Sequence, residues 1–235
     1  MKRQDYTAEH HALLLGLFGR TLEERYGEYG LDVLANGIIR YGHQRGRRMR
    51  ERAVRDGRRL DYETFLAYGE LRISSGPEDY STKQESPVYV NCCHRCMWQE
   101  GWAKYGLERY GEPYCRYVDI SLVQGFNPDM VMITKTAIGL GDDCCTFVNV
   151  GYEQTEESRK RIAAVKEELA GKYTKDFLYH SGHLLAALRD TTADIFGAES
   201  GDRTAEQTAG AFEKYLDSRA AAELLAEASL DFDRI

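Results

Sequence analysis

The sequence predicts an α+β fold, a small antiparallel sheet flanked by N-terminal and C-terminal helices. Three observations lead to this fold class. Apolar residues recur at helical spacing over long stretches at both ends of the 235-residue chain. Short runs in the middle alternate apolar and polar residues, as half-buried strands do. Glycine, proline and aspartate gather between those runs, as they do in turns. Helices and strands segregated in this way are typical of α+β proteins.

Helices are expected first along the chain. The apolar spacing predicts a helix from Thr7, as its N-cap, to about Tyr26, with Gly27 as its stop. A second helix is predicted from about Leu31 into the fifties. It carries most of the nine arginines between residues 40 and 59, and such a run usually forms a solvated helix face. A shorter helix over residues 62–71 and a polar loop up to residue 87 follow.

The pattern changes after Pro87. The run VYVNC, residues 88–92, alternates as a strand does, and two helices are expected after it, over residues 97–106 and 113–126. Two further strand candidates, MVMITKT and CTFVNV, are joined by the turn GLGDD. The central part of the chain is therefore expected to supply the whole sheet.

The rest of the chain is expected to be helical over residues 156–170, 175–196 and 204–229, with a break at GAESGD. We expect residues 1–153 to form one α+β domain and residues 154–235 to form a C-terminal helical extension packed on that domain. Those last helices would cover the sheet or meet a partner subunit, so a homo-oligomer is one expected arrangement.

Charge and composition narrow the function. The net charge of −7 argues against a general nucleic-acid-binding protein, because such proteins gather Lys and Arg to neutralise phosphates. The apolar run at residues 12–18 is too short to cross a membrane. Asp5 and Glu9 interrupt any signal-peptide pattern. We therefore expect a cytoplasmic protein that acts on a small molecule. Disulfides seldom persist in the cytoplasm, so the six cysteines are expected to be reduced.

All six cysteines fall within residues 92–145. Cys93 and Cys96 have the spacing of half a zinc site, but the second half is missing, because adjacent cysteines in a strand point to opposite faces. A three-thiolate metal site of Cys96, Cys115 and Cys145 is one alternative. A thioredoxin-like redox pair is another, although the parallel βαβ pattern of those proteins is absent. Some of the six are expected to be small buried hydrophobic residues.

A pocket lined by thiols and a carboxylate is the fourth interpretation. Cys96 begins a predicted helix, whose dipole favours the thiolate. Cys115 and Asp119 are four residues apart and so share a helix face, where the carboxylate can act as a general base. Cys145 begins the last strand behind an acidic turn. The other three cysteines are expected to be packing residues, namely Cys92, Cys93 and Cys144.

Three runs, RCMWQEGWAKYG, YCRYVDISLVQGFNP and TKTAIGLGDDCCTF, form an ordered set. Its residues are Cys96, Trp98, Gly106, Cys115, Asp119, Phe126, Asn127, Pro128, Gly141, Asp142, Cys145 and Phe147. With the leading HHALL and RYGHQRGRRM, the set resembles the L-2-amino-thiazoline-4-carboxylic acid hydrolase family over residues 8–150. Residues 97 and 144 are less typical of that family, and the extra Cys92 and Cys93 stand outside its motif.

This resemblance implies a hydrolase of a cyclic, amidine-like thioether, whose ring water opens at C2 to give N-carbamoyl-cysteine. Asp119 would then be the general base or orient the water, and Cys96 or Cys115 would be a covalent nucleophile. Arg45 or Arg48 would turn inward to hold the substrate carboxylate. The remaining expected site residues are Cys145, Trp98 as an apolar wall, and Asn127 as a substrate contact.

Two other functions remain open from the sequence. The closing Gly-Asp-x-x-Cys strand also resembles vinyl-reductase-type domains that bind small ligands, which implies a non-catalytic ligand-binding or sensory domain. A metalloenzyme could use His10, His11, His180 or His183, and the last two are three residues apart on a predicted helix, as metal ligands often are. The sequence identifies no cofactor, so the cofactor is unknown at this point.

Overall fold

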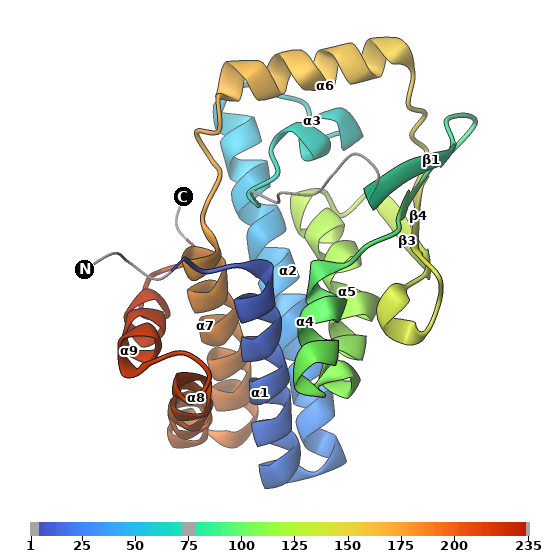
Figure 1. Ribbon diagram of the computed structural model, residues 1–235. Coiled ribbons are helices and arrows are strands. Elements are labelled where there is room, and N and C mark those ends of the chain that lie inside the picture. Colours follow the sequence, from blue (N-terminus) through green and yellow to red (C-terminus); the bar gives the residue numbers. More distant parts are fainter. Residues whose placement is uncertain (1–4, 72–78, 234–235) are drawn as a thin grey trace. The chain divides into compact units, whose positions relative to one another are not determined.

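The computed structural model describes residues 5–71 and 79–233. Within these residues, helices precede, interrupt and follow a four-stranded antiparallel sheet (Figure 1). The predicted fold class, α+β with a small antiparallel sheet and helices before and after it, is therefore confirmed. The elements form two compact units, each assembled from segments that are distant in the sequence. The predicted boundary after residue 153 stays a prediction.

Unit 1 consists of residues 5–41, 97–117 and 176–232. It contains α1 (Ala8–Tyr26), α4 (Met97–Tyr105) and α7 (Phe177–Phe196), with the beginnings of α2 (Glu28–Arg55) and α5 (Glu108–Phe126). Helix α1 begins after Thr7 and ends at Gly27, as the sequence predicts. It packs against α4, α7 and α8. Its leucines and phenylalanine are fully buried because the middle of the helix is enclosed on all sides, with every residue from His11 to Gly19 buried.

The C-terminal helices of unit 1 differ from the prediction. A single helix was expected over residues 204–229, after a break at GAESGD. Instead, Gly197 alone ends α7, and α8 (Ala198–Glu213) begins directly after it. A second stop near residue 214 separates α8 from α9 (Ser218–Glu227), whose N-cap is Asp217. The second glycine of GAESGD, Gly201, lies inside α8 and packs directly against α7. A bulkier residue at this position would collide with α7.

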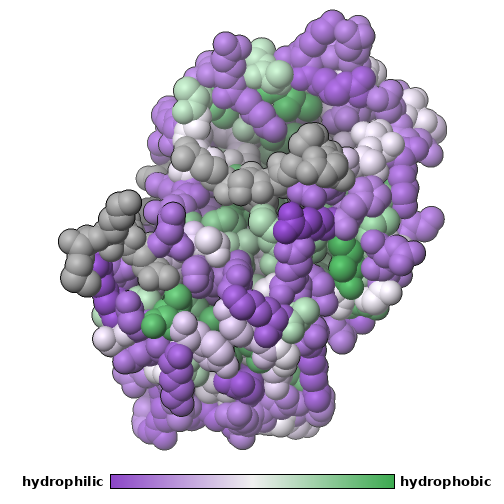
Figure 2. All heavy atoms as spheres, in the orientation of Figure 1, coloured by the Kyte–Doolittle hydropathy of each residue, from purple (hydrophilic) through white to green (hydrophobic). Residues whose placement is uncertain are grey.

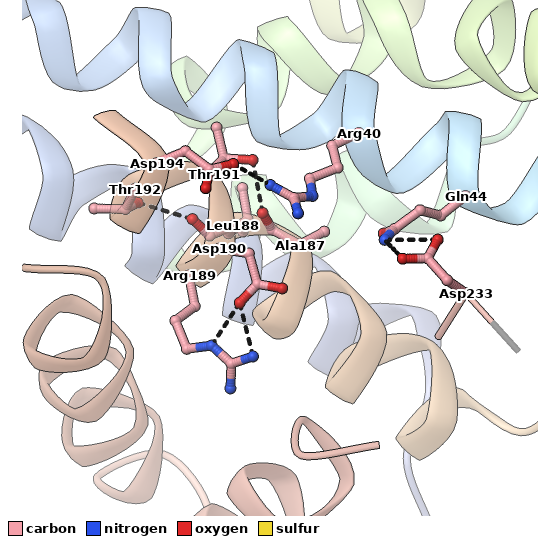
Figure 3. Close-up of polar contacts among 10 residues, drawn as sticks. All are labelled: Arg40, Gln44, Ala187, Leu188, Arg189, Asp190, Thr191, Thr192, Asp194 and Asp233. Carbon is pink, nitrogen blue, oxygen red and sulfur yellow. Dashed lines mark hydrogen bonds and ion pairs between the residues drawn. The ribbon is translucent and has the colours of Figure 1, made fainter. Parts of the chain in front are cut away.

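An ion pair with α2 helps to hold α7 in place within its unit, and two threonines of α7 are satisfied by hydrogen bonds inside the helix (Figure 3). Thr191 and Thr192 each donate a hydrogen bond to the carbonyl four residues earlier, at 2.8 Å. Arg40 of α2 donates to Asp194 at 2.6 Å. The threonine hydroxyls are thereby satisfied inside an apolar interface, where an unpaired hydroxyl would be costly.

Unit 2 holds the sheet, together with α3 (Tyr62–Ala67), α6 (Glu156–Leu169) and the later parts of α2 and α5. The strand order is β1-β2-β4-β3, and every neighbouring pair is antiparallel. The strands are β1 (Tyr80–Gln84), β2 (Tyr89–Cys93), β3 (Val131–Thr136) and β4 (Cys145–Val150). The short 3-10 helix Ile138–Leu140 lies between β3 and β4.

Strand β1 corrects the expected polar loop. The run YSTKQ is exposed along its whole length, so it lacks the buried face by which strands are recognised in a sequence. It pairs with β2 through its backbone at the edge of the sheet. Polar, charged edge strands are common because they discourage pairing with other chains. A second difference is that α5 begins five residues earlier than predicted, so Pro113 lies inside the helix, where it cannot donate a hydrogen bond to the carbonyl four residues earlier.

One apolar core joins the sheet to the helices of unit 2. Its buried members come from α2, α3, α5, β3, α6 and the segments next to them. Examples are Met49, Tyr62, Phe126 and Met132. In the middle of α2, Gln44 donates to Asp233 at 3.3 Å (Figure 3).

Hydrophilic residues predominate on the face shown in Figure 2, and hydrophobic residues appear there as small, separate patches. Among the described residues, every helix is too short or too polar to span a membrane.

Candidate functional site

Three side chains form a row across one end of the sheet. Tyr80 of β1 lies opposite Cys93 of β2, and Cys93 lies opposite Cys145 of β4. Directly opposed residues share a face of an antiparallel sheet. The Tyr80 hydroxyl hydrogen-bonds with the Cys93 thiol, the Cys93 thiol donates to the carbonyl of Arg95 at 3.0 Å, and the Ile138 amide donates to Cys145 Sγ at 3.4 Å.

Asp119 of α5 and Cys96 lie within electrostatic reach of this row. The charges of both groups act on Cys145 and on Tyr80, and Asp119 also acts on Cys93. Such direct influence requires that the groups lie close together. We call Tyr80, Cys93, Cys96, Asp119 and Cys145 the thiol cluster. The structure thus brings together three of the predicted site residues, Cys96, Asp119 and Cys145.

The thiols of the cluster differ in reactivity. Burial raises the pKa of Cys145 to about 12, with further contributions from Cys96, Cys93 and Asp119. Burial also raises the pKa of Cys93, and the Arg95 and Tyr80 hydrogen bonds only partly oppose it. Both side chains therefore stay protonated at neutral pH. Cys96 is half-buried and directly precedes α4, where a helix N-terminus favours a thiolate.

The carboxyl of Asp119 is enclosed by protein, although part of the residue still reaches solvent. Burial raises the pKa of Asp119 above its ordinary value, and the positive charge of Arg45 opposes that rise. A carboxyl group with a raised pKa exchanges protons more readily near neutral pH than an ordinary aspartate does. Asp119 can therefore serve as an acid in one step and as a base in another.

A buried arginine group lies beside Asp119. Arg45, Arg48 and Arg52 are each at most 4% exposed, and all three face Glu70, which is fully buried. Arg48 donates to both Glu70 oxygens at 3.1 Å, and Arg52 Nη1 donates to Oε1 at 2.7 Å. Arg45 Nε lies farther away, 3.7 Å from Oε2. We call these four residues the Glu70 cluster.

The arginine run of α2 is therefore divided. Arg45 and Arg48 turn inward and pair with Glu70 of the same chain, and the expectation that one of them holds a substrate carboxylate stays a prediction. Arg52 joins them, one turn farther along the helix. Arg45 contacts Glu70 least closely and also acts on Asp119. It links the Glu70 cluster to the thiol cluster.

Two predicted site residues lie in unit 1. Trp98 was expected to form an apolar wall, but its indole nitrogen donates a hydrogen bond to His11 Nδ1 at 3.0 Å, and its ring stacks on Tyr114. Cys115 is half-buried on α5, one turn before Asp119. Their roles at the substrate stay predictions.

The amide of Asn127 is held by the backbone at the end of α5. Its nitrogen donates to the carbonyl of Leu60 at 2.7 Å, and its oxygen accepts from the amide of Asp129 at 3.0 Å. Asn127 also lies eight residues beyond Asp119, about 12 Å along a helix. These contacts give Asn127 a structural role in closing the helix, and its predicted contact with substrate stays a prediction.

The histidines weighed as metal ligands have other partners. His10 Nδ1 accepts from the Thr7 amide at 3.0 Å and so caps α1. His11 accepts from Trp98, so its other nitrogen carries the proton and donates to the Tyr41 hydroxyl at 3.2 Å. His183 stacks on Phe232. Within residues 5–71 and 79–233, no three His, Cys, Asp or Glu side chains are arranged to hold a metal ion.

Sequence reasoning missed Tyr80, Cys93 and Glu70. Tyr80 was hidden in the expected loop, because YSTKQ is exposed along its whole length and carries no strand-like alternation. Cys93 continues the alternation of VYVNC by one residue, which placed it on the face of Tyr89 and Asn91. Glu70 offered no local signal, because a single glutamate after a short helix is ordinary. All six cysteines are free in the structure, as the prediction of reduced thiols requires.

Comparison with known proteins supports the motif set described above. The sequence model of the L-2-amino-thiazoline-4-carboxylic acid hydrolase family matches residues 6–148, more than half of the chain. No curated protein and no solved structure shows significant similarity to the chain. The matched range includes the whole thiol cluster, the Glu70 cluster and all four strands up to residue 148. The chain therefore belongs to the L-2-amino-thiazoline-4-carboxylic acid hydrolase family.

Proposed function

We propose that the protein hydrolyses a small heterocyclic carboxylate of the 2-aminothiazoline-4-carboxylate type, and that the thiol cluster performs the reaction. One observation carries the proposal. A carboxyl group of raised pKa, Asp119, lies with three thiols and beside a buried arginine within one compact unit. The family's hydrolase name supports the same reaction class.

Cys96 is the proposed nucleophile. It is the accessible thiol of the cluster, whereas the raised pKa values of Cys93 and Cys145 keep those two protonated. The Cys96 thiolate attacks C2 of the ring, and the bond from C2 to the ring sulfur breaks. An isothiourea is left on Cys96, and the departing substrate thiolate takes a proton from Asp119.

In the second step Asp119 acts as a base instead of an acid. Its carboxylate takes one proton from a water molecule, while the oxygen of that water attacks the same carbon. The Cys96 thiolate departs, the second water proton ends on the former ring nitrogen, and N-carbamoyl-cysteine is released. The cycle consumes one water and leaves Asp119 protonated again, so the raised pKa of Asp119 suits both steps.

Arg45 is the proposed partner of the substrate carboxylate. Of the three arginines in the Glu70 cluster, it lies farthest from Glu70 and acts on Asp119. A guanidinium group binds a planar carboxylate through two parallel hydrogen bonds. Arg48 and Arg52 hold Glu70 more tightly and would keep Arg45 oriented.

The test is a chromatographic and mass-spectrometric assay of the reduced protein with 2-aminothiazoline-4-carboxylate. We expect N-carbamoyl-cysteine to form. Asp119→Asn should lower kcat by roughly 100-fold or more, while the exposed Asp129→Asn serves as a matched control and should keep full activity. Acid quenching should trap an adduct on Cys96 that has gained the full mass of the substrate.

Several outcomes would count against the proposal. Equal activity of Asp119→Asn and Asp129→Asn would remove Asp119 from the mechanism. Full turnover by Cys96→Ser would exclude the covalent step and leave direct attack by water. Saturable binding of the compound without any product would replace the hydrolase with the alternative of a ligand-binding domain.

A further inference from the structure

A second group of thiols lies on the opposite face of the sheet from the thiol cluster. Cys92 Sγ lies 3.6 Å from Cys144 Sγ and 3.3 Å from Thr146 Oγ1. Lys83 Nζ lies 3.6 Å from Cys144 Sγ and 3.3 Å from the same Thr146 hydroxyl. We call Lys83, Cys92, Cys144 and Thr146 the redox group.

Strand register explains how this group forms. Cys92 of β2 lies opposite Thr146 of β4, and successive residues of a strand point to opposite faces. Cys144 precedes Thr146 by two positions and so reaches the same face. The adjacent residues Cys93 and Cys145 form the opposed pair on the other face. Each pair of neighbouring cysteines in the sequence therefore sends one thiol to each side.

An irregularity in β1 brings the lysine to the group. The register of β1 against β2 shifts between Thr82 and Gln84, so Lys83 is the extra residue of a bulge. Bulges re-aim a side chain relative to regular strand geometry. Lys83 thereby places a positive charge beside Cys144, although the side chain itself is exposed.

The two thiols of the redox group differ in access. Cys144 is half-buried, whereas Cys92 is completely buried. Hydrogen bonding with the Thr146 hydroxyl and with the Cys92 thiol lowers the pKa of Cys144, and the Lys83 ammonium contributes to the same shift. A partly exposed thiol beside a cation, with a second thiol within reach, is the arrangement found at oxidant-sensitive cysteines.

We propose that Cys144 is a site of oxidation by hydroperoxides and that Cys92 resolves the product into a reversible disulfide. The Cys144 thiolate attacks one oxygen of hydrogen peroxide, the O–O bond breaks, and hydroxide leaves to become water. The resulting sulfenic acid is attacked by Cys92 sulfur, its S–O bond breaks, and the Cys92 proton leaves with the departing hydroxide as water. Two thiols and one peroxide thus yield one disulfide and two waters.

The closure needs only a small movement. A disulfide requires about 2.05 Å between its sulfurs, and the two thiols stand 3.6 Å apart before oxidation. The loop before β4 supplies the freedom, because Cys144 precedes the first paired residue of that strand. A low-molecular-weight thiol would reverse the reaction by attacking the exposed sulfur of Cys144.

The first experiment measures alkylation of each cysteine of the intact protein by iodoacetamide at pH 7, followed over time by peptide mass spectrometry. Cys144 should react faster than Cys145, its neighbour in the sequence, by at least tenfold. Lys83→Met should slow Cys144 roughly threefold because it removes the nearby charge, and Lys83→Arg should restore the rate. Equal rates at Cys144 and Cys145 would overturn the proposal.

The second experiment treats the protein with one equivalent of hydrogen peroxide, blocks the remaining thiols and digests with trypsin. The disulfide should join the peptides 84–95 and 136–159. In the double variant Cys93→Ser, Cys145→Ser, these peptides hold only Cys92 and Cys144, and the link should persist. It should disappear in Cys144→Ser and return to free thiols with dithiothreitol. Two results would refute the proposal that Cys92 and Cys144 form a disulfide. One is a disulfide-linked pair of peptides that survives in Cys144→Ser, and the other is oxidation of Cys144 to the sulfinic acid without any disulfide.

Discussion

Replacing Glu70 with glutamine tests the electrostatic centre of unit 2. Glu70 is fully buried among three guanidinium groups and accepts hydrogen bonds at 3.1, 3.1 and 2.7 Å. Charge-assisted bonds of this kind are worth about 1.5–3 kcal/mol each, so their simple total is roughly 5–9 kcal/mol. Glutamine keeps one acceptor oxygen, and contributions within one network are not additive. We expect Glu70→Gln to lower the free energy of unfolding by about 3–5 kcal/mol.

The loss of stability in Glu70→Gln should depend on pH. Burial by itself would raise the pKa of Glu70, but Arg48, Arg45 and Arg52 outweigh it, so the pKa of Glu70 is lower than its ordinary value. A lowered folded-state pKa contributes stability above the ordinary pKa, and this stability is lost as the pH falls toward the folded-state value. The difference between the wild type and Glu70→Gln should therefore shrink below about pH 4.5.

Urea denaturation between pH 3 and pH 8, followed by circular dichroism, would measure both effects. Glu63→Gln is the matched control, because Glu63 pairs with Arg161 at the surface. Exposed pairs contribute about 0–1 kcal/mol. A Glu70→Gln loss no larger than that of the control, or a loss that stays constant down to pH 3, would refute the assignment of Glu70 as the buried counter-charge.

Two further predictions concern the same unit. Because burial raises the folded-state pKa of Asp119, its stabilising contribution is greatest below the ordinary pKa and declines as the pH rises toward the folded-state value. Asp119→Asn should therefore increase stability at pH 7 by about 1.4 kcal/mol per unit of raised pKa; equal denaturation midpoints for both proteins from pH 4 to pH 8 would contradict this. Gly46→Ala should lower stability by about 2–3 kcal/mol, because the new Cβ would lie 2.2 Å from the carbonyl oxygen of Leu122. In Gly210→Ala the new Cβ meets no atom within 4 Å. In the same denaturation experiments this variant should be neutral or stabilised by about 0.5–1 kcal/mol. Equal losses of stability in the two variants would show that the helix contact at Gly46 does not limit packing.

Local chemistry made much of the fold predictable. The ends of α1 follow from Thr7 and Gly27, which act within one helical turn. Strand β3 follows from an alternation that reflects one buried face, and β4 follows from its run of strand-forming residues, CTFVNV, which is buried or half-buried at all but its last residue. Strand β1 could not be recognised in this way, because an exposed edge strand is held by backbone pairing and its side chains carry no burial pattern.

The candidate site was likewise predictable only in part. Asp119 and Cys96 could be proposed because a shared helix face and a helix start are local features, and the ordered motif supported them. Neither the partners of Arg45 nor the roles of the six cysteines could be assigned, because those depend on which residues meet across the sheet. Cys93 was expected to be a packing residue, yet its register partner is Cys145.

By itself the sequence determined the α+β class, the family and most of the helices and strands, because each rests on residue spacing along the chain, but it did not reveal β1 or the break between α8 and α9. Only the tertiary structure decided which arginines leave the solvated face of α2 and which thiols share a face of the sheet. The physical reason is that Glu70 becomes a buried counter-charge only when α2 packs beside it. Likewise, the neighbouring thiols Cys144 and Cys145 acquire opposite pKa shifts only when the strand directs one toward Lys83 and the other into the interior.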